Sequence, residues 1–170
     1  EYEGAYYTLS ETKMPFKADK TVDDDYFILT LFTLVQEARK KNINLTGKDV
    51  VLGVGLPPAD FGQQAVGFKQ YFIDHSRHGI NFRMNDKPVS FYLKDVFVSP
   101  QNFAAVMCFK ASLLKKYRTV NCIDIGDGTV DLLVIRNGKP DLSVRVSERS
   151  GMAVLRSEIS NRIQQNYGIH

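Results

Sequence analysis

The apolar positions of the chain follow two different periods, which predict a mixture of helices and strands. Apolar side chains recur every three to four residues over residues 27–38 and 151–163, as expected of helices that bury one face. Two further helices are expected over residues 60–74, where Gly62 and Gly67 weaken the pattern, and over residues 100–117. Short runs rich in β-branched and aromatic residues predict strands over residues 2–9, 49–55, 80–84, 89–93, 95–99, 120–125, 129–135 and 139–146. The run over residues 49–55 stops at two prolines, and we expect it to be a buried strand.

Turn and cap residues mark where several of these elements begin and end. Asn137-Gly138 is typical of a two-residue hairpin turn, and residues 85–88 suit a second hairpin. Ser99 is a natural N-cap, with Pro100 after it at the first helical position. Residues 150–151 open the last helix, whose apolar face we expect to contain Met152, Leu155, Ile159 and Ile163.

Composition argues against several classes of protein. The chain has 44% apolar residues, which is ordinary for a globular protein. Its formal net charge is +3 and its basic residues are scattered, so we expect no surface that binds nucleic acid directly. No segment reaches the roughly 20 apolar residues of a membrane span, so a cytoplasmic location is expected. Cys108 and Cys122 lie in apolar stretches as free thiols, and His75 and His78 suit a solvated helix end better than a metal site. The chain does not begin with Met, and we expect it to be part of a longer protein.

The stretch over residues 122–131 carries the clearest chemistry. Asp124 ends an apolar strand, and Gly126 and Gly128 then permit positive φ and leave no Cβ in the way, so that backbone N–H groups can converge on an anion such as phosphate. A carboxylate beside phosphate repels it unless Mg²⁺ lies between them. The same residues also fit a plain hairpin in which Asp and Gly only satisfy turn geometry.

The order of residues in this stretch resembles the second phosphate loop of the actin, heat-shock chaperone and sugar-kinase superfamily, which reads Asp-x-Gly-x-Gly-Thr-x-Asp. Residues 51–57, with their Gly-Leu-Pro ending, look like a strand and loop of the plasmid-partition (ParM-like) actins. Residues 96–105 resemble the strand and helix start at which the superfamily places the polar residue that orients the attacking water. Partition actins often have Pro-Glu at this step, whereas this chain has Pro100-Gln101.

The resemblance implies a partial actin-like, ribonuclease H-like α/β fold with mixed sheets and flanking helices. Residues 1–118 would be the remainder of a first lobe, and residues 119–170 the start of a second. It also implies that Gln101 positions water and that Asp124 binds Mg²⁺ through water, while the residues near ATP are Gly126, Asp127, Gly128, Thr129, Asp131 and Gly151. Simpler interpretations exist for Gln101 as a first-turn polar residue, for Asp131 as an acid that bonds to the turn, and for Gly151 as a helix cap.

The expected function is that of a bacterial, Mg-dependent ATPase that forms nucleotide-dependent filaments and segregates plasmid or other DNA through a DNA-binding adaptor protein. Two alternatives stay open, namely a small-molecule kinase of the same superfamily and a non-catalytic structural module of ribonuclease H-like fold. The superfamily's first phosphate loop and its adenosine motif are not found among residues 1–170, so we expect the fragment alone to bind ATP weakly or not at all.

Overall fold

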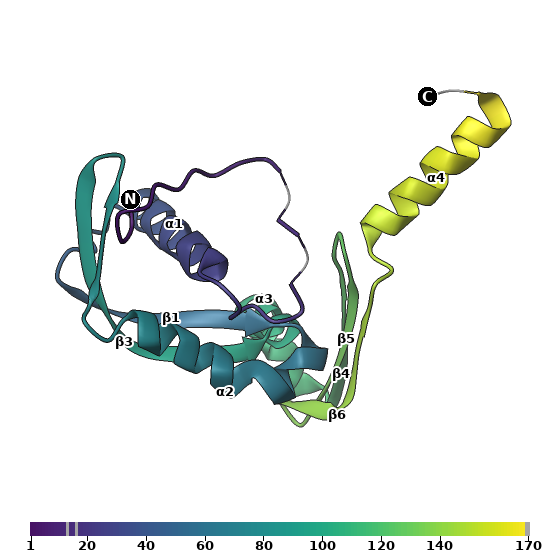
Figure 1. Ribbon diagram of the computed structural model, residues 1–170. Coiled ribbons are helices and arrows are strands. Elements are labelled where there is room, and N and C mark those ends of the chain that lie inside the picture. The colour runs from purple at the N-terminus through teal and green to yellow at the C-terminus, as the bar shows by residue number, and fades with distance from the viewer. Residues whose placement is uncertain (13, 16, 169–170) are drawn as a thin grey trace. The chain divides into compact units, whose positions relative to one another are not determined.

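The structure is a computed structural model of the 170-residue chain and describes every residue except 13, 16, 169 and 170. Figure 1 shows helices and strands mixed along the chain, as the two periods predicted. The elements in chain order are α1 (Asp25–Lys40), β1 (Lys48–Leu56), α2 (Pro58–His75), β2 (Ile80–Met84), β3 (Lys87–Pro100), α3 (Gln101–Lys116), β4 (Thr119–Ile125), β5 (Val130–Arg136), β6 (Lys139–Glu148) and α4 (Met152–Tyr167).

The chain divides into two compact units. The first comprises Glu1–Val54 and Val66–Val98, and the second comprises Gly55–Ala65 and Ser99–His170. Helix α3 belongs to the second unit because it packs against β4 and β5. This division differs from the boundary expected after residue 118. That residues 1–118 and 119–170 belong to two lobes of a longer protein stays a prediction.

The sheet of the first unit has the strand order β1-β3-β2. Strands β2 and β3 pair antiparallel through a two-residue turn at Asn85 and Asp86, both with positive φ, which confirms the predicted hairpin. Strand β3 runs without a break to Pro100, so the two strands expected over residues 89–99 are one. The expected buried strand is only half right, because β1 lies at the edge of the sheet and leaves Val51 55% exposed while Leu52 is buried.

Aromatic rings form the centre of the first unit. Phe27 of α1, Phe72 of α2 and Phe91 of β3 are each 1% exposed. The ring of Phe27 lies 6.2 Å from that of Phe72 and 6.5 Å from that of Tyr71, measured between centroids. Since burying one large apolar side chain contributes about 1.5–3 kcal/mol, these rings hold the two predicted helices against the sheet.

Residues 2–9 form only an isolated bridge between Tyr2 and Ala5, so the strand predicted for these residues is wrong. Tyr2 and Ala5 exchange two backbone hydrogen bonds of 3.0 Å. Glu3 and Gly4 between them have positive φ, so the chain reverses within two residues. A tyrosine-rich run has high strand propensity, but propensity cannot provide the partner strand that a ladder needs.

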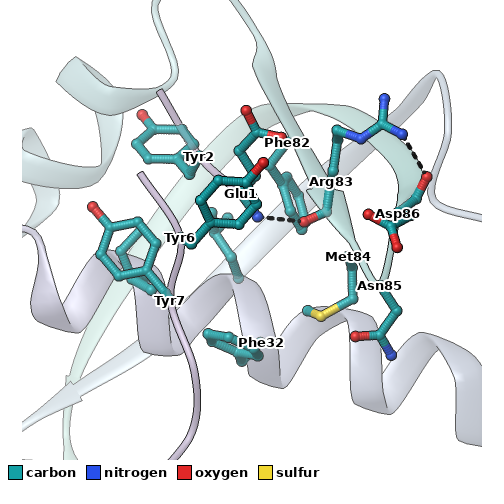
Figure 2. A pocket seen from close by; sticks show the side chains of 12 residues that line it. Glu1, Tyr2, Tyr6, Tyr7, Phe32, Phe82, Arg83, Met84, Asn85 and Asp86 are labelled. Atoms are coloured by element: carbon teal, nitrogen blue, oxygen red, sulfur yellow. Dashed lines mark hydrogen bonds between the residues drawn. The ribbon is translucent and has the colours of Figure 1, made fainter. Parts of the chain in front are cut away.

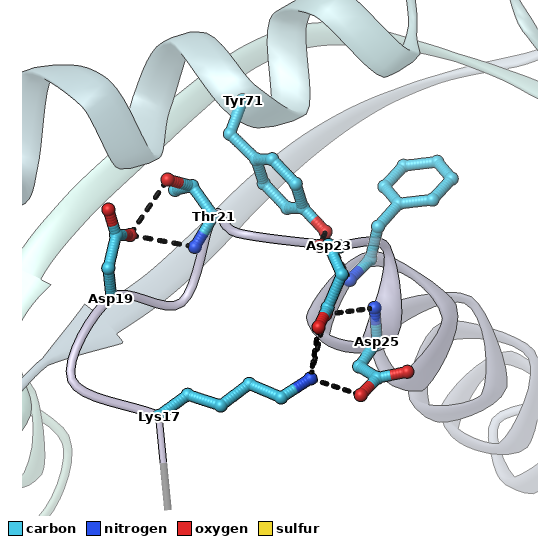
Figure 3. A network of polar contacts seen from close by, with 7 residues as sticks. Lys17, Asp19, Thr21, Asp23, Asp25 and Tyr71 are labelled. Atoms are coloured by element: carbon cyan, nitrogen blue, oxygen red, sulfur yellow. Dashed lines mark hydrogen bonds and ion pairs between the residues drawn. The ribbon is translucent and has the colours of Figure 1, made fainter.

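A polar network ties the start of α1 to α2 (Figure 3). The Lys17 ammonium bonds to Asp23 at 2.6 Å and also to Asp25. The Tyr71 hydroxyl donates to the Asp23 carbonyl at 2.8 Å and accepts the Phe27 N–H at 3.0 Å. Burial raises the pKa of Tyr71 to about 12, which keeps this hydroxyl protonated and able to donate.

The second unit is built on an antiparallel sheet of order β4-β5-β6. The β5–β6 turn is the predicted Asn137-Gly138, and both residues have positive φ. Leu133 and Ile135 of β5 are at most 1% exposed. Helix α3 begins at Gln101 with Pro100 as its N-cap, so the cap lies one residue later than the predicted Ser99.

Helix α4 forms as predicted, but none of its residues is buried. The four residues of its expected apolar face are each 37–49% exposed: Met152, Leu155, Ile159 and Ile163. The face is therefore present in the sequence without a covering element in the described part of the chain. No helix among the described residues is both long enough and apolar enough to span a bilayer.

Candidate functional site

The turn between β4 and β5 has a closed backbone. The Gly126 N–H donates to the Thr129 carbonyl at 2.9 Å. Neither Gly126 nor Gly128 has positive φ, so that part of the prediction is wrong. The absence of a Cβ matters instead, since one built on Gly126 would lie 3.1 Å from the Thr129 carbonyl oxygen, whereas one on Gly128 would meet nothing within 4 Å. One glycine closes the turn, and the other leaves open space beside it.

The carbonyl groups of this turn face the start of α4. The N–H of Met152 donates to Gly126 O at 3.0 Å and the N–H of Ala153 to Asp127 O at 2.8 Å. A Cβ on Gly151 would lie only 2.5 Å from Asp127 O and 2.7 Å from Gly126 O. Gly151 therefore allows α4 to approach the turn, and the turn carbonyls satisfy N–H groups that a helix start otherwise leaves unpaired. A contact between Gly151 and nucleotide stays a prediction.

Because the turn carbonyls point to α4, the N–H groups of the same peptide units point away from α4. Within the described residues, the backbone N–H groups of Gly128 and Thr129 have no hydrogen-bond acceptor. Asp127, Gly128 and the space beside them are exposed to solvent. Consecutive free amides in a concave turn favour an anion. Phosphate binding by residues 126–129 stays a prediction.

The two acids of the motif face each other across the sheet. Asp124 on β4 and Asp131 on β5 are direct partners in the antiparallel register. Asp131 is 5% exposed, and its carboxylate accepts hydrogen bonds from the hydroxyls of Thr129, at 3.0 Å, and Ser147. Asp124 is exposed. Like charges directly opposite are unfavourable, and a bound cation would relieve the repulsion.

These contacts give the acids different roles. Asp131 is enclosed by hydroxyl donors, so it braces the turn, as the simpler interpretation held, although it uses hydroxyls and not turn amides. Asp124 keeps its carboxylate available to solvent and is the better candidate to hold Mg²⁺. Neither metal binding by Asp124 nor nucleotide contact by Asp131 and Thr129 is tested by the geometry, and both stay predictions.

Asn102 was not among the residues predicted for the site. It lies in the first turn of α3, is 1% exposed, and donates its side-chain N–H to the Asp131 carbonyl at 3.1 Å. Because that carbonyl only accepts, the orientation of the amide is fixed, and among the described residues Oδ1 has no donor. Asn102 thus anchors the start of α3 to the strand that carries Asp131. A lone polar residue after Pro-Gln gives no sequence signal of burial.

Gln101 lies directly beside this anchor. Its Nε2 donates to the Gly55 carbonyl over a long 3.4 Å. A Cβ on Gly55 would lie 2.6 Å from the Gln101 Cγ, so the predicted Gly-Leu-Pro loop leaves the room that this side chain occupies. The second unit therefore contains Gln101, the turn and both acids.

Comparison with known proteins supports the fold. No family model matches the chain, and no curated protein matches it. The solved archaeal actin homolog Ta0583 matches with a TM-score of 0.75 over 96% of this chain, at 18% identity. The AlfA filament from the B. subtilis plasmid pLS32 matches with a TM-score of 0.67 over 100% of this chain and 63% of AlfA, at 15% identity. Apo ParM of pSK41 gives 0.57 over 86% of this chain and 47% of ParM, at 14% identity.

The chain has an actin-like fold. The resemblance predicted from the β4–β5 turn is confirmed at this level. The chain spans 50% of the length of Ta0583, so the activity of a whole actin-like protein is not established by the match. Ta0583 has also been solved in complex with ADP, with a TM-score of 0.57 and 18% identity.

Cys122 lies on β4, the same strand of the actin-like fold that carries Asp124. Its Sγ is 3.8 Å from the Asn102 carbonyl. Burial and, to a smaller extent, the Asp124 charge raise the pKa of this thiol, so it stays neutral near pH 7. Cys122 is therefore a packing residue and a reporter of the charge on Asp124.

A hollow in the first unit is lined by aromatic rings and a hairpin tip, including Tyr2, Tyr6, Phe82 and Arg83 (Figure 2). Nearby, the ring nitrogens of His75 lie 2.8 Å from the Tyr71 carbonyl and 3.0 Å from the Asp24 carboxylate. The residues described contain no cluster of three His, Cys, Asp or Glu side chains that could hold a metal. No predicted nucleotide-site residue lies in this unit.

Proposed function

We propose that this chain is part of a bacterial actin-like protein that binds Mg·ATP, assembles into filaments in the cytoplasm and segregates plasmid or other DNA. The observation that supports this most is the β4–β5 turn, whose carbonyls face α4 while the N–H groups of Gly128 and Thr129 have no acceptor in the described part of the chain. Filament formation is supported by the fold match to AlfA, which was solved as a filament, also with AMPPNP bound. Nucleotide binding is supported by the ADP complex of the archaeal homolog.

Each residue of the turn has a distinct role in this proposal. The N–H groups of Asp127, Gly128 and Thr129 hold phosphate oxygens, and Asp124 holds Mg²⁺ through water. When bound, the metal neutralises charge on the phosphates. Asp131 keeps the turn closed through Thr129 and so maintains the direction of the free amides.

Gln101 is the residue that we propose for orienting the attacking water. Its Nε2 donates to Gly55 O, which leaves Oε1 as the acceptor for a water hydrogen. This role requires placement more than basicity, because phosphoryl transfer depends mainly on positioning and charge stabilisation. Asn102 supports that placement by fixing the first turn of α3 to β5.

The rest of the nucleotide site lies outside residues 1–170 in this proposal, since the chain spans 50% of the archaeal actin homolog. The isolated chain is then expected to bind ATP weakly or not at all, and the intact protein is the one to test. Contact with DNA would pass through an adaptor protein, because charge on this chain is nearly balanced at +3.

Sedimentation of the intact protein tests the proposal. Polymer should pellet with Mg·ATP and not without nucleotide, and Asp124→Ala should abolish pelleting. Asp49→Ala, which removes an exposed carboxylate at the start of β1, is the matched control and should pellet normally. Pelleting that ignores nucleotide would refute the ATP-dependent filament, and phosphorylation of a small acceptor would favour the kinase alternative.

A further inference from the structure

An ion pair joins the β4–β5 turn to α4. The Arg156 guanidinium Nη2 binds the Asp127 carboxylate Oδ1, and the two side chains are 59% and 41% exposed. Arg156 lies one helical turn after Met152, whose N–H binds the Gly126 carbonyl. Because side chains on a helix tilt toward its N-terminus, Arg156 reaches back to the turn.

Asp127 creates an electrostatic problem for an anion site. Its backbone N–H is one of those proposed to hold phosphate, yet its side chain places a negative charge within the same four-residue turn, next to the free amides of Gly128 and Thr129. Like charges at this separation repel, and the repulsion is stronger near a protein surface than in bulk water. An uncompensated carboxylate here would weaken binding of phosphate.

We propose that Arg156 is a positioning residue whose guanidinium neutralises Asp127 and so permits an anionic phosphate to bind the turn amides. The inference rests on the proposed function and adds a residue to its site. Arg156 acts through Asp127, so it is a positioning residue and does not itself contact phosphate.

A purely structural role for the pair is a weaker explanation. The start of α4 is already held by backbone bonds from Met152 and Ala153 to the turn and by the close approach of Gly151. Exposed ion pairs add little to stability. Loss of the guanidinium should therefore change ligand affinity while leaving the unfolding temperature nearly unchanged.

A double-mutant cycle tests the inference in the intact protein, with Mg·ADP as the probe and calorimetry as the readout. Arg156→Gln should weaken binding by about tenfold at low salt, and the loss should shrink as salt screens the exposed charges. In an Asp127→Asn background, which keeps the backbone N–H, the same change at Arg156 should alter affinity less than twofold. Arg162→Gln removes a charge further along α4 and should have no effect.

The outcomes separate the possible errors. If Arg156→Gln weakens binding equally in the Asp127→Asn background, Arg156 contacts the ligand directly and the neutralisation is refuted. If Arg156→Gln binds Mg·ADP like the wild type, the inference fails while the proposed function stands. The same holds if Arg156→Gln clearly lowers the unfolding temperature, because the pair would then have a structural role. If the wild-type protein does not bind Mg·ADP, the proposed function fails and the inference with it.

Discussion

Replacing Gly151 with alanine should separate the β4–β5 turn from α4. The added Cβ would lie 2.5 Å from Asp127 O and 2.7 Å from Gly126 O, whereas ordinary contact begins at 3.4 Å. Both obstacles are backbone atoms, so no rotamer change can relieve them. The turn and the helix must therefore move apart by roughly 0.7–0.9 Å, which is the difference between these distances.

That movement has a calculable cost. It would stretch the Met152 and Ala153 hydrogen bonds from 3.0 and 2.8 Å to beyond normal length. A hydrogen bond contributes about 0.5–1.5 kcal/mol net, so losing both gives a cost of about 1–3 kcal/mol, similar to that of overpacking elsewhere. In a chain of this size, 1 kcal/mol lowers Tm by about 2–4 °C, so Gly151→Ala should melt about 2–12 °C lower.

Gly128→Ala is the matched control in the same turn. A Cβ on Gly128 meets nothing within 4 Å and the residue has no positive φ, so the substitution should leave Tm unchanged. Thermal unfolding followed by circular dichroism measures both variants, and hydrogen exchange should show faster exchange of the Met152 and Ala153 amides in Gly151→Ala alone. Equal Tm values and equal exchange in the two variants would refute the packing role of Gly151.

Two further predictions concern Gln101 and Cys122. Gly55→Ala places a Cβ 2.6 Å from the Gln101 Cγ, so the Gln101 side chain must rotate away. Phosphate release by the intact protein should then slow about tenfold, while nucleotide affinity stays unchanged. An unchanged rate of release would contradict the role of Gln101. The raised pKa of Cys122 means that its alkylation should begin only above the usual thiol range, with exposed Cys108 as the internal reference. Asp124→Asn removes a charge that disfavours the thiolate, so it should shift the onset to lower pH; an identical pH profile would show that the carboxylate does not act on the thiol.

Local signals explain why much of this fold could be predicted. The helices α1, α2 and α3 and both hairpins follow from spacing and turn residues, because each depends on neighbours in sequence. The motif also placed Asp124 and Asp131 correctly at the two ends of one turn, where they become cross-strand partners. The motif did not predict that Asp131 is buried while Asp124 is exposed, because two partners of Asp131, Asn102 and Ser147, come from α3 and β6.

The features that could not be predicted depend on contacts between distant segments. The edge position of β1 depends on strand order, and the burial of Asn102 depends on how α3 meets β5. Gly151 was expected near nucleotide, yet its lack of a Cβ is explained first by the Asp127 carbonyl, 24 positions earlier in the chain. A glycine in a sequence does not show whether another atom lies close to it, as at Gly151, or whether the space beside it is open, as at Gly128, and only the structure distinguishes the two cases.

The direction of the free amides depends on α4 as much as on the turn. The Asp127 carbonyl accepts the Ala153 N–H, and the Gly128 carbonyl accepts the Gly151 N–H over a long 3.4 Å. A planar peptide unit whose carbonyl is held in this way directs its N–H to the opposite side, and these two units carry the N–H groups of Gly128 and Thr129. If anion binding requires that direction, then docking of α4 and binding of phosphate stabilise each other by the same free energy. The exposed apolar face of α4 gives a way to change this coupling. An element that covers Leu155 and Ile159 would stabilise the docked helix. It would therefore strengthen anion binding at the β4–β5 turn without contacting the turn.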